Sequence, residues 1–343
     1  MTTVTRFQTT QAQAASISGP ANFDAELNNP NRRIMKTLNF GVEIELAEIS
    51  TDRMLEVMEV FFGRGRTVVR SHQGYNSYGV KDDQGRVWFA MTDSSIRSRS
   101  GRGAELVTPP LAYADIPVLQ DLLRRLRRAG GRANSSTGIH VHIGLDRQDG
   151  STALDIGAIK RWIKNTSKFE YLMRQALQID ASRLNTYTRP IREDIVADVD
   201  RVRNLDDLNR LVFRRGESNF RNNHVRNQYE IGRYPRERYQ GMNLVNIWRI
   251  GTIEGRWFNG TTNAGTLRAY ITLMLALAEK AITTTRASST PRVIEAGNEK
   301  YAVRTWLIQL GLIGDEFKTV RSKLTKHLNG NASWVHGRPE AVA

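Results

Sequence analysis

Two histidines one residue apart, His140 and His142, lie in the apolar run GIHVHIG at residues 138–144. Side chains at positions i and i+2 of a β-strand point to the same face. If this run is a strand, both imidazoles therefore face the same way. Such a pair could bind a metal ion, or the two rings could form a hydrogen-bonded structural pair.

Carboxylates repeat this spacing elsewhere in the chain. Glu43 and Glu45 are two apart in VEIEL, and Glu254 and Arg256 are two apart in GTIEGRWF. Glu105 is the charged residue of the apolar segment GAELV. Neighbouring carboxylates repel each other unless a cation lies between them. A solvated strand face would explain any one of these patterns alone, because charged side chains usually face water.

The coincidence of four such strands favours one shared site. If they belong to one sheet, their polar residues form a single surface of Glu43, Glu45, Glu105, His140, His142, Glu254 and Arg256. Carboxylate oxygens suit Mg²⁺, which shares them with phosphates, and an arginine complements phosphate. Zinc is the competing interpretation because imidazoles suit it. The excess of carboxylates favours magnesium with a nucleotide.

The hydrophobic pattern predicts the elements that position these residues. Alternation predicts strands at residues 38–49, 101–110, 138–146 and 243–260, and a strand pair around a turn at 80–93. Helical spacing predicts helices at 52–62, 116–131, 156–178 and 264–282. This irregular order of strands and helices favours an α+β fold over a doubly wound parallel sheet.

The chain divides into three predicted parts. Residues 1–35 form a polar, flexible arm, residues 36–285 a catalytic domain, and residues 286–343 shorter helices with a polar tail. Within the domain, residues 183–240 hold 13 arginines against 9 acidic residues and show little apolar periodicity. We expect a long, mobile, basic loop there.

The charge balance indicates possible partners. Lys and Arg total 50 against 35 for Asp and Glu, a net charge of +15. Such a surface attracts nucleic acid or nucleotide phosphates, although it could equally serve only to keep the chain in solution. The chain has no cysteine, which excludes disulfides and thiolate metal sites. No Walker-type phosphate loop occurs, and neither does a G-x-S-x-G or H-E-x-x-H element.

No segment predicts contact with a membrane. The first 33 residues lack the apolar core of a signal peptide. The apolar run at 269–282 is too short to span a bilayer and is typical of a buried helix. We therefore expect a soluble, cytoplasmic protein.

In this order, the four strand motifs resemble the family described as "putative amidoligase". It belongs to the carboxylate–amine ligase superfamily, with glutamine synthetase and the glutamate–cysteine ligases. The matching pieces are FGVEIEL (40–46), TDSSI with GAELVTPPL (92–111), STGIHVHIG (136–144) and the stretch from RYQGMNLVN to the following apolar helix (238–281). The resemblance covers residues 36–285, and its specificity lies in the ordered set.

The resemblance implies a fold and a reaction. The fold is an antiparallel sheet forming an open cup, with helices on its outer face and two or three Mg²⁺ ions at the nucleotide phosphates. ATP phosphorylates a carboxylate, and an amine then attacks the acyl phosphate to give an amide, ADP and phosphate. The substrates would be small-molecule or peptide carboxylates and amines, bound by variable loops at 64–86 and 183–240.

The resemblance also implies a role for individual residues. The metal ligands would be Glu43, Glu45, Glu105, His140 and Glu254. The catalytic residues would be Glu105, Glu254 and Arg256, with the arginine steadying the transferred phosphoryl group. Nucleotide contacts would come from His142, Arg256, Arg238 and Asn243, and substrate contacts from Asp93 and Tyr239.

One position departs from the family pattern. Gly255, between Glu254 and Arg256, stands where the family usually has a large apolar residue. This position should face away from the site, so we expect lost packing rather than lost chemistry. A glycine in a strand can also mark a bulge or a close backbone contact.

Three other functions stay open at this point. The basic surface suits a protein that binds or modifies nucleic acid. The same fold supports guanidino-type phosphotransferases, which form no amide. A relic of the family would bind no nucleotide. The sequence identifies neither the carboxylate nor the amine.

Overall fold

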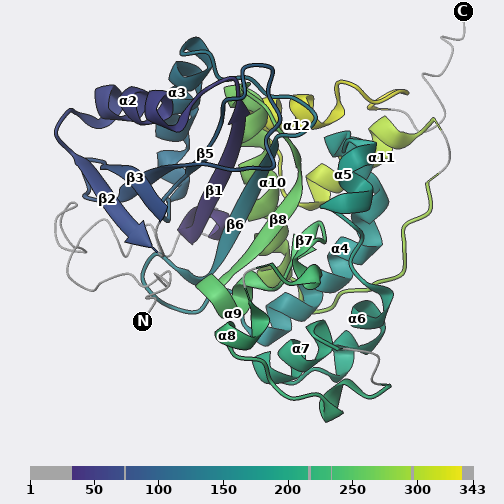
Figure 1. The fold of residues 1–343 in the computed structure, drawn as a ribbon. Helices are drawn as coiled ribbons and strands as arrows, with labels where there is room; N and C mark the ends of the chain where they lie inside the picture. The colour runs from purple at the N-terminus through teal and green to yellow at the C-terminus, as the bar shows by residue number, and fades with distance from the viewer. Residues whose placement is uncertain (1–32, 73–74, 215–217, 233, 295–296, 334–343) are drawn as a thin grey trace, which may run out of the picture.

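The computed structural model describes residues 33–72, 75–214, 218–232, 234–294 and 297–333 (Figure 1). The predicted arm at residues 1–35 therefore lies almost wholly outside the described residues, and so does the end of the predicted tail.

A mixed architecture of one sheet and surrounding helices confirms the α+β prediction. Within the described residues the sheet has eight strands in the order β2-β3-β4-β5-β1-β6-β8-β7, and each neighbouring pair is antiparallel. The strands are β1 (Leu38–Ala47), β2 (Thr67–His72), β3 (Tyr75–Lys81), β4 (Val87–Met91), β5 (Gly103–Val107), β6 (Gly138–Arg147), β7 (Met242–Asn243) and β8 (Thr252–Asn259). The four motif-bearing strands are contiguous as β5-β1-β6-β8.

Helices cover the apolar face of the sheet (Figure 1). In β1 the buried Val42, Ile44 and Leu46 alternate with Glu43 and Glu45, so the two faces of the strand differ in polarity. The longer helices are α2 (Thr51–Phe62), α3 (Ile116–Arg128), α4 (Ile156–Leu177), α10 (Ala264–Thr283), α11 (Glu299–Gln309) and α12 (Lys318–Thr325). Among the described residues, no helix is long and apolar enough to cross a bilayer.

Local signals explain where these helices begin and end. Asp155 accepts a hydrogen bond from the Ala158 amide (2.7 Å) at the start of α4, and Asn263 accepts one from Thr266 (3.0 Å) at the start of α10. Such N-caps satisfy amides that have no partner within the helix. Helix α2 ends at Gly63, whose φ of 111° suits a glycine.

The prediction of a long loop at 183–240 was wrong. The described part of this segment, with the residues just before it, forms the short helices α5 (Ala181–Thr186), α6 (Glu193–Asp198), α7 (Leu205–Val212) and α8 (Gln228–Ile231). Ile195, Leu208 and Phe213 are buried. Each apolar run is too short to show helical periodicity, yet together the runs form a packed layer next to α4.

Two smaller predictions also need correction. Residues 243–260 are not one strand, because α9 (Asn246–Ile250) separates β7 from β8 and ends at Gly251 with φ 73°. Residues 64–86 are not a loop, because β2 and β3 form a hairpin there, and the predicted pair at 80–93 corresponds to β3 and β4. Single 3-10 turns complete the structure: η1 (Ile34–Thr37), η2 (Tyr113–Asp115), η3 (Val199–Arg201), η4 (Phe220–Asn222), η5 (Arg236–Arg238) and η6 (Asp315–Phe317).

Gly255 allows α10 to approach the sheet closely. A Cβ at this position would lie 2.5 Å from Sδ of the buried Met274, so the methionine occupies the space of the missing side chain. The register also shifts beside the glycine: Val141 pairs with Gly255, but Ile139 pairs with Phe258, which leaves one extra residue in β8. Both expected features, close contact and a bulge, therefore occur here.

We predict that Gly255→Ala lowers the free energy of unfolding by about 1–3 kcal/mol, because the added methyl group overpacks a filled core. Urea denaturation measures the change. Met274→Ala removes the clashing atoms, so Gly255→Ala should cost less in that background. An equal cost in both backgrounds would contradict this packing argument. Gly157→Ala, in the first turn of α4, is the control and should be neutral or slightly stabilising.

Candidate metal centre

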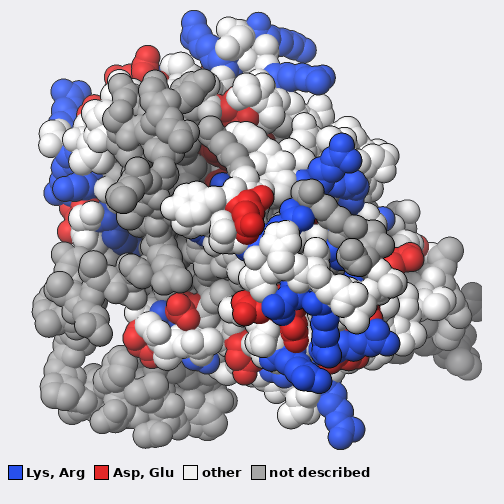
Figure 2. All heavy atoms as spheres, turned by 60° about the horizontal axis from the view of Figure 1, so that its bottom comes forward, with Lys and Arg blue, Asp and Glu red and all other residues white. Residues whose placement is uncertain are grey.

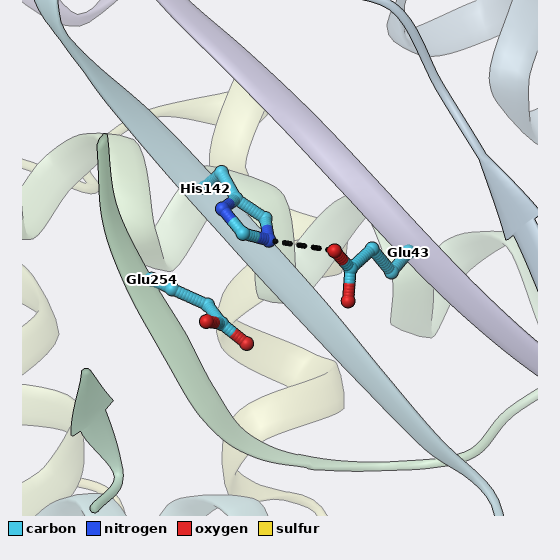
Figure 3. A group of neighbouring side chains, drawn as sticks. All are labelled: Glu43, His142 and Glu254. Atoms are coloured by element: carbon cyan, nitrogen blue, oxygen red, sulfur yellow. Dashed lines mark ion pairs between the residues drawn. The ribbon is translucent and has the colours of Figure 1, made fainter. Parts of the chain in front are cut away.

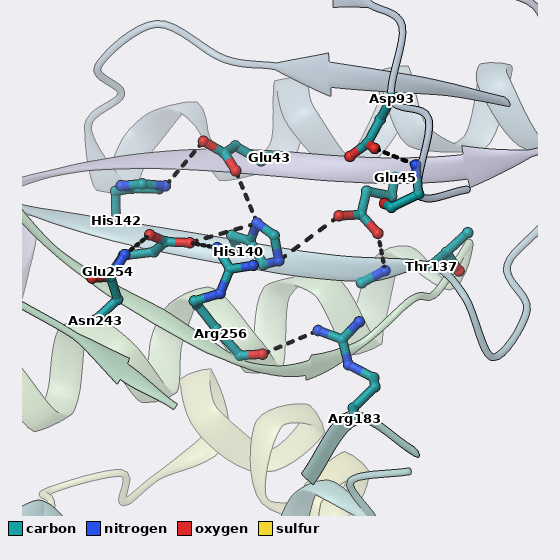
Figure 4. Close-up of polar contacts among 12 residues, drawn as sticks. Glu43, Glu45, Asp93, Thr137, His140, His142, Arg183, Asn243, Glu254 and Arg256 are labelled. Atoms are coloured by element: carbon teal, nitrogen blue, oxygen red, sulfur yellow. Dashed lines mark hydrogen bonds and ion pairs between the residues drawn. The ribbon is translucent and has the colours of Figure 1, made fainter. Parts of the chain in front are cut away.

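Strand register brings the predicted residues onto one face of the sheet. Glu43 of β1 stands opposite His140 of β6, Glu45 opposite Glu105 of β5, and His142 opposite Glu254 of β8. Residues directly opposite on neighbouring strands place their side chains together. Figure 4 shows Glu43, Glu45, His140, His142 and Glu254 converging from the central strands, with Asp93 joining them from the loop after β4.

Glu43 lies between the two histidines. Its Oε2 is 2.8 Å from Nδ1 of His140, and its Oε1 is 3.3 Å from Nε2 of His142. On the far side of the ring, Nδ1 of His142 lies 3.1 Å from Oγ1 of Thr252, which fixes the orientation of the imidazole. Figure 3 shows Glu43, His142 and Glu254 facing one another across three adjacent strands.

Glu254 is held by donors on both oxygens. Nδ2 of Asn243 and Nδ2 of Asn246 donate to its Oε2 at 2.6 and 2.7 Å. Nη1 of Arg256 donates to its Oε1 at 2.6 Å, and Nδ1 of His140 lies 3.6 Å from the same oxygen. The side chain is only 2% exposed. These contacts keep the carboxylate ionised and fix its orientation.

Acidic groups gather at the other end of the face. Oε2 of Glu45 accepts a hydrogen bond from the Gly138 amide at 2.7 Å. Ligand atoms of Glu45, Asp93 and Glu105 all lie within 4.8 Å of one another. No cation among the described side chains lies within ion-pair distance of Asp93 or Glu105. A cation from outside the chain would offset the repulsion among these carboxylates.

Three groups of side chains in the described structure have the spacing of a metal site. They are Glu43, His142 and Glu254; Glu43, Glu105 and His140; and Glu45, Asp93 and Glu105. Glu43 and Glu105 each belong to two groups, so neighbouring ions could share them. Nε2 of His142 is buried and lies 3.3 Å from Oε1 of Glu43, so in the neutral imidazole this nitrogen can join the carboxylate as a ligand of one cation. The donor set therefore fits divalent cations.

The pKa values differ along this surface. Burial, and then the charges of Glu43, Glu45 and Asp93, raise the pKa of Glu105 well above its ordinary value of 4.5. Burial also raises the pKa of Glu45, with a further contribution from Asp93. Burial opposes ionisation of Glu254 too, but Arg256 and His142 outweigh it and lower that pKa. A bound cation would therefore relieve the most repulsion at the Glu45–Glu105 end.

Glu43 and His142 also shift each other's pKa. Burial tends to raise the pKa of Glu43, but hydrogen bonds from His140 and His142 hold it well below 4.5. Burial tends to lower the pKa of His142, yet Glu254 and Glu43 raise it overall. Protons and metal ions therefore compete for the same lone pairs.

Four predicted site residues lie outside the three groups: Arg238, Tyr239, Asn243 and Arg256. Arg238, in η5, has its guanidinium over the rings of Tyr234 and Tyr239, 5.2 and 5.6 Å from their centroids. The Tyr239 ring lies 6.1 Å from that of Tyr187. Asn243, predicted to contact nucleotide, donates to Glu254, and Asp93, predicted to contact substrate, lies with the carboxylates of a candidate metal group.

Sequence reasoning missed several residues that shape the site. Asn246 and Thr252 orient Glu254 and His142, and the Gly138 amide binds Glu45. Arg183 donates from Nη2 to the carbonyl of Arg256 at 3.1 Å. A usable signal existed only for Asn246, which repeats the asparagine of the motif three residues after Asn243. Arg183 stood in the segment predicted as a loop.

Comparison with protein-family models gives a match over most of the chain. Residues 36–278 match the family described as "Putative amidoligase enzyme", which agrees with the resemblance of the strand motifs. Among curated proteins no match is found. All three metal-site groups lie inside the matched region.

We predict that Glu105→Gln stabilises the metal-free protein at neutral pH. Folding raises the pKa of this acid, so the folded state holds its proton to a higher pH than the unfolded state does. The stability that this difference provides is complete below pH 4.5 and is lost as the pH rises through the pKa of the folded state. The variant avoids that loss. Thermal unfolding in EDTA from about pH 4 to 8 should show a midpoint advantage that grows with pH.

Mg²⁺ should reverse the order of the two proteins. The ion stabilises the form that binds it, so wild type gains more than the variant. Glu170→Gln is the matched control: burial raises the pKa of Glu170 also, but this residue lies outside the three groups. Its response to Mg²⁺ should equal that of wild type. Parallel pH curves for wild type and Glu105→Gln would refute the assignment.

Proposed function

The chain belongs to the family of "putative amidoligase" enzymes, and on that premise we propose that it is an ATP- and Mg²⁺-dependent carboxylate–amine ligase. The observation that carries the proposal is the continuous face on which Glu43 and Glu105 each join two candidate metal groups. We further propose that its antiparallel sheet is the open cup of the glutamine synthetase-like fold, with the helices on the outer side.

Charge supports a metal–nucleotide complex on this face. The carboxylates of Glu43, Glu45, Asp93, Glu105 and Glu254 outnumber the guanidinium groups of Arg183 and Arg256. Like charges would repel ATP from such a surface. Two divalent cations would reverse the sign, and the face would then attract phosphate oxygens. Metal binding and nucleotide binding are therefore expected to be coupled.

The residues of the chain supply positioning and electrostatics. When bound, Mg²⁺ neutralises charge on the transferred phosphoryl group and orients its oxygens. Arg256 is held by Glu254, and its Nε makes no hydrogen bond in the described structure, so it can donate to a phosphoryl oxygen. Asn243 and Asn246 keep Glu254 from rotating. Side chains fixed in this way lose little entropy when substrate binds.

The proposed reaction has two steps. An oxygen of the acid substrate attacks the γ-phosphorus of ATP, the bond to the β-phosphate oxygen breaks, and ADP leaves. The amine nitrogen then attacks the acyl carbon, inorganic phosphate leaves, and the nitrogen loses a proton. The buried His140 and the partly exposed Glu43 lie on this face, 2.8 Å apart, next to where the reacting groups would bind.

We predict that ADP and phosphate form together only when ATP, Mg²⁺, an acid and an amine are all present. Pooled carboxylates and amines with product analysis by mass spectrometry provide the test, and omission of pool members identifies the substrates. Glu254→Gln should lower turnover by more than about 100-fold, and Asn246→Ala by about 10- to 100-fold. Glu170→Gln should leave turnover unchanged.

Other outcomes assign other functions. ADP with a phosphorylated acceptor, but neither free phosphate nor amide, would indicate the guanidino-type phosphotransferase. Full turnover by Glu254→Gln would contradict the site assignment. Absence of Mg²⁺-dependent nucleotide binding in wild type would contradict the proposed function itself.

Nucleic-acid binding is the second candidate, and the exposed arginines of α3 favour it. Arg124, Arg127 and Arg128 point outward from this helix. Figure 2 shows further Lys and Arg side chains, with acidic residues among them, on the face that holds α6 to α8. There the positive charge is partly neutralised, because Arg192 pairs with Asp194 (2.5 Å) and Arg214 with Asp198 (2.6 Å).

We predict that any binding to duplex DNA depends on α3. The logarithm of the affinity should fall linearly with the logarithm of salt concentration, because the arginines displace condensed counterions. The triple variant Arg124→Gln/Arg127→Gln/Arg128→Gln should flatten that slope, and Arg203→Gln should not. Fluorescence anisotropy over a salt series measures both. A slope near zero in wild type would remove this candidate.

A further inference from the structure

Arg183 reaches the candidate active site from outside the four strand motifs. It lies in α5 and is only 4% exposed. Its guanidinium packs on the backbone of Gly138, at the start of β6, and its Nη2 donates to the Arg256 carbonyl at 3.1 Å. Figure 4 shows the side chain rising from α5 toward Arg256, on the side of the site that holds Thr137 and Glu45.

Gly138 makes room for this guanidinium. A Cβ at position 138 would lie 2.5 Å from both Nη1 and Nη2 of Arg183. The same glycine donates its amide to Glu45, so the arginine and the acidic end of the site meet at one residue. The placement of Arg183 thus depends on the absence of a single methyl group.

The charge of Arg183 has no carboxylate partner in the described structure. By contrast, Arg256 pairs with Glu254 at 2.6 Å, and the partly buried Arg86 pairs with Asp115 at 2.7 Å. For Arg183, no described carboxylate lies within ion-pair distance, and its Nε makes no hydrogen bond. A guanidinium stays charged at any physiological pH, and burying it without a counter-ion is costly.

Nearby acids compensate this charge only partly. Burial lowers the pKa of Arg183, and Glu45 offsets that effect incompletely, while Arg256 adds repulsion. Glu45 itself is engaged by the Gly138 amide and belongs to a candidate metal group. Once a cation binds there, Glu45 offers Arg183 still less compensation.

We propose that Arg183 binds a substrate oxyanion, either the carboxylate of the acid substrate or the phosphoryl group in transfer. The inference rests on the proposed function, since it places this anion beside the metal groups. The fork of a guanidinium matches either oxyanion with two parallel N–H donors. Arg183 would then be a substrate-binding residue contributed by the helical segment at 183–240.

Binding of simple anions tests this without any need for turnover. Isothermal titration at saturating Mg²⁺, with inorganic phosphate and separately with acetate, would use the full chain. Wild type should bind at least one of the two, and Arg183→Gln should weaken that binding by about 10- to 100-fold, as expected for one charge-assisted contact. Arg183→Lys should restore part of it. Arg203→Gln, an exposed arginine of the same segment, should bind as wild type does.

The two anions distinguish the two sources. Preference for acetate would assign the subsite to the acid substrate, and preference for phosphate to the transferred group. If wild type bound neither anion, or if Arg183→Gln bound as wild type does, the proposal would be overturned. A purely structural counter-charge predicts the second result, together with tighter Mg²⁺ binding by the variant.

Gly138→Ala provides an independent variant that keeps the charge. The added methyl group should displace the guanidinium, because the clashing atoms are the end of a flexible side chain. Anion binding should weaken in this variant as in Arg183→Gln. In the double variant, Gly138→Ala should add almost nothing, since the group it displaces is already gone. Additive losses would show that Gly138 acts through something other than Arg183.

Anion titration also separates this inference from the proposed function. If no acid and amine yield ADP, but Arg183→Gln selectively loses anion binding, the subsite stands and the ligase assignment falls. If the ligase reaction is found and Arg183→Gln changes neither anion binding nor KM for the acid, the subsite falls and the ligase assignment stands.

Discussion

The register between β1 and its two neighbours is the constraint on which the site depends. Because side chains alternate along a strand, a slip of one residue would turn Glu43 and Glu45 into the core and bring Val42 and Ile44 to the polar face. The apolar alternation that packs against the helices therefore also aligns the carboxylates. Stability and site geometry are set by the same pairing, so the sheet cannot keep one without the other.

Electrostatics divides that face into two parts. Asn243, Asn246 and Arg256 donate hydrogen bonds to Glu254, and these keep its carboxylate ionised and fix its orientation. Around Glu105, burial and three neighbouring carboxylates oppose ionisation. The first part is organised by the chain alone, and the second needs a cation. Under the proposed function, such a site would be preorganised for an anion only once metal had bound, which would impose an order on binding.

Sequence patterns predicted the strands of this site well, because alternation is a local property. The faces of Glu43, His140 and Glu254 followed from period-two spacing alone, and the order of the motifs indicated the family. The prediction failed where tertiary contacts decide. Asn246 lies in the short helix α9, which one-dimensional patterns merge with β8. The helices of 183–240 have apolar runs too short for periodicity, so their burial against α4 could not be foreseen.

Gly138 and Gly255 show why such contacts escape motif analysis. Both glycines matter because they have no Cβ. The space that a Cβ would take is filled by Arg183 at Gly138 and by Met274 at Gly255, and only the folded structure shows this. The segment with Arg183 is joined to β8 from both ends: the Asp180 amide donates to Asn259 Oδ1 (3.1 Å), and the Arg256 amide donates to the Gly241 carbonyl (2.8 Å). A displacement of these helices would therefore be transmitted to the strand that carries Glu254 and Arg256. The helical segment with Arg183 and the strand with Glu254 and Arg256 thus form one frame. Under the proposed function, a shift of this segment on substrate binding would move Arg256, the residue proposed to contact the phosphoryl group.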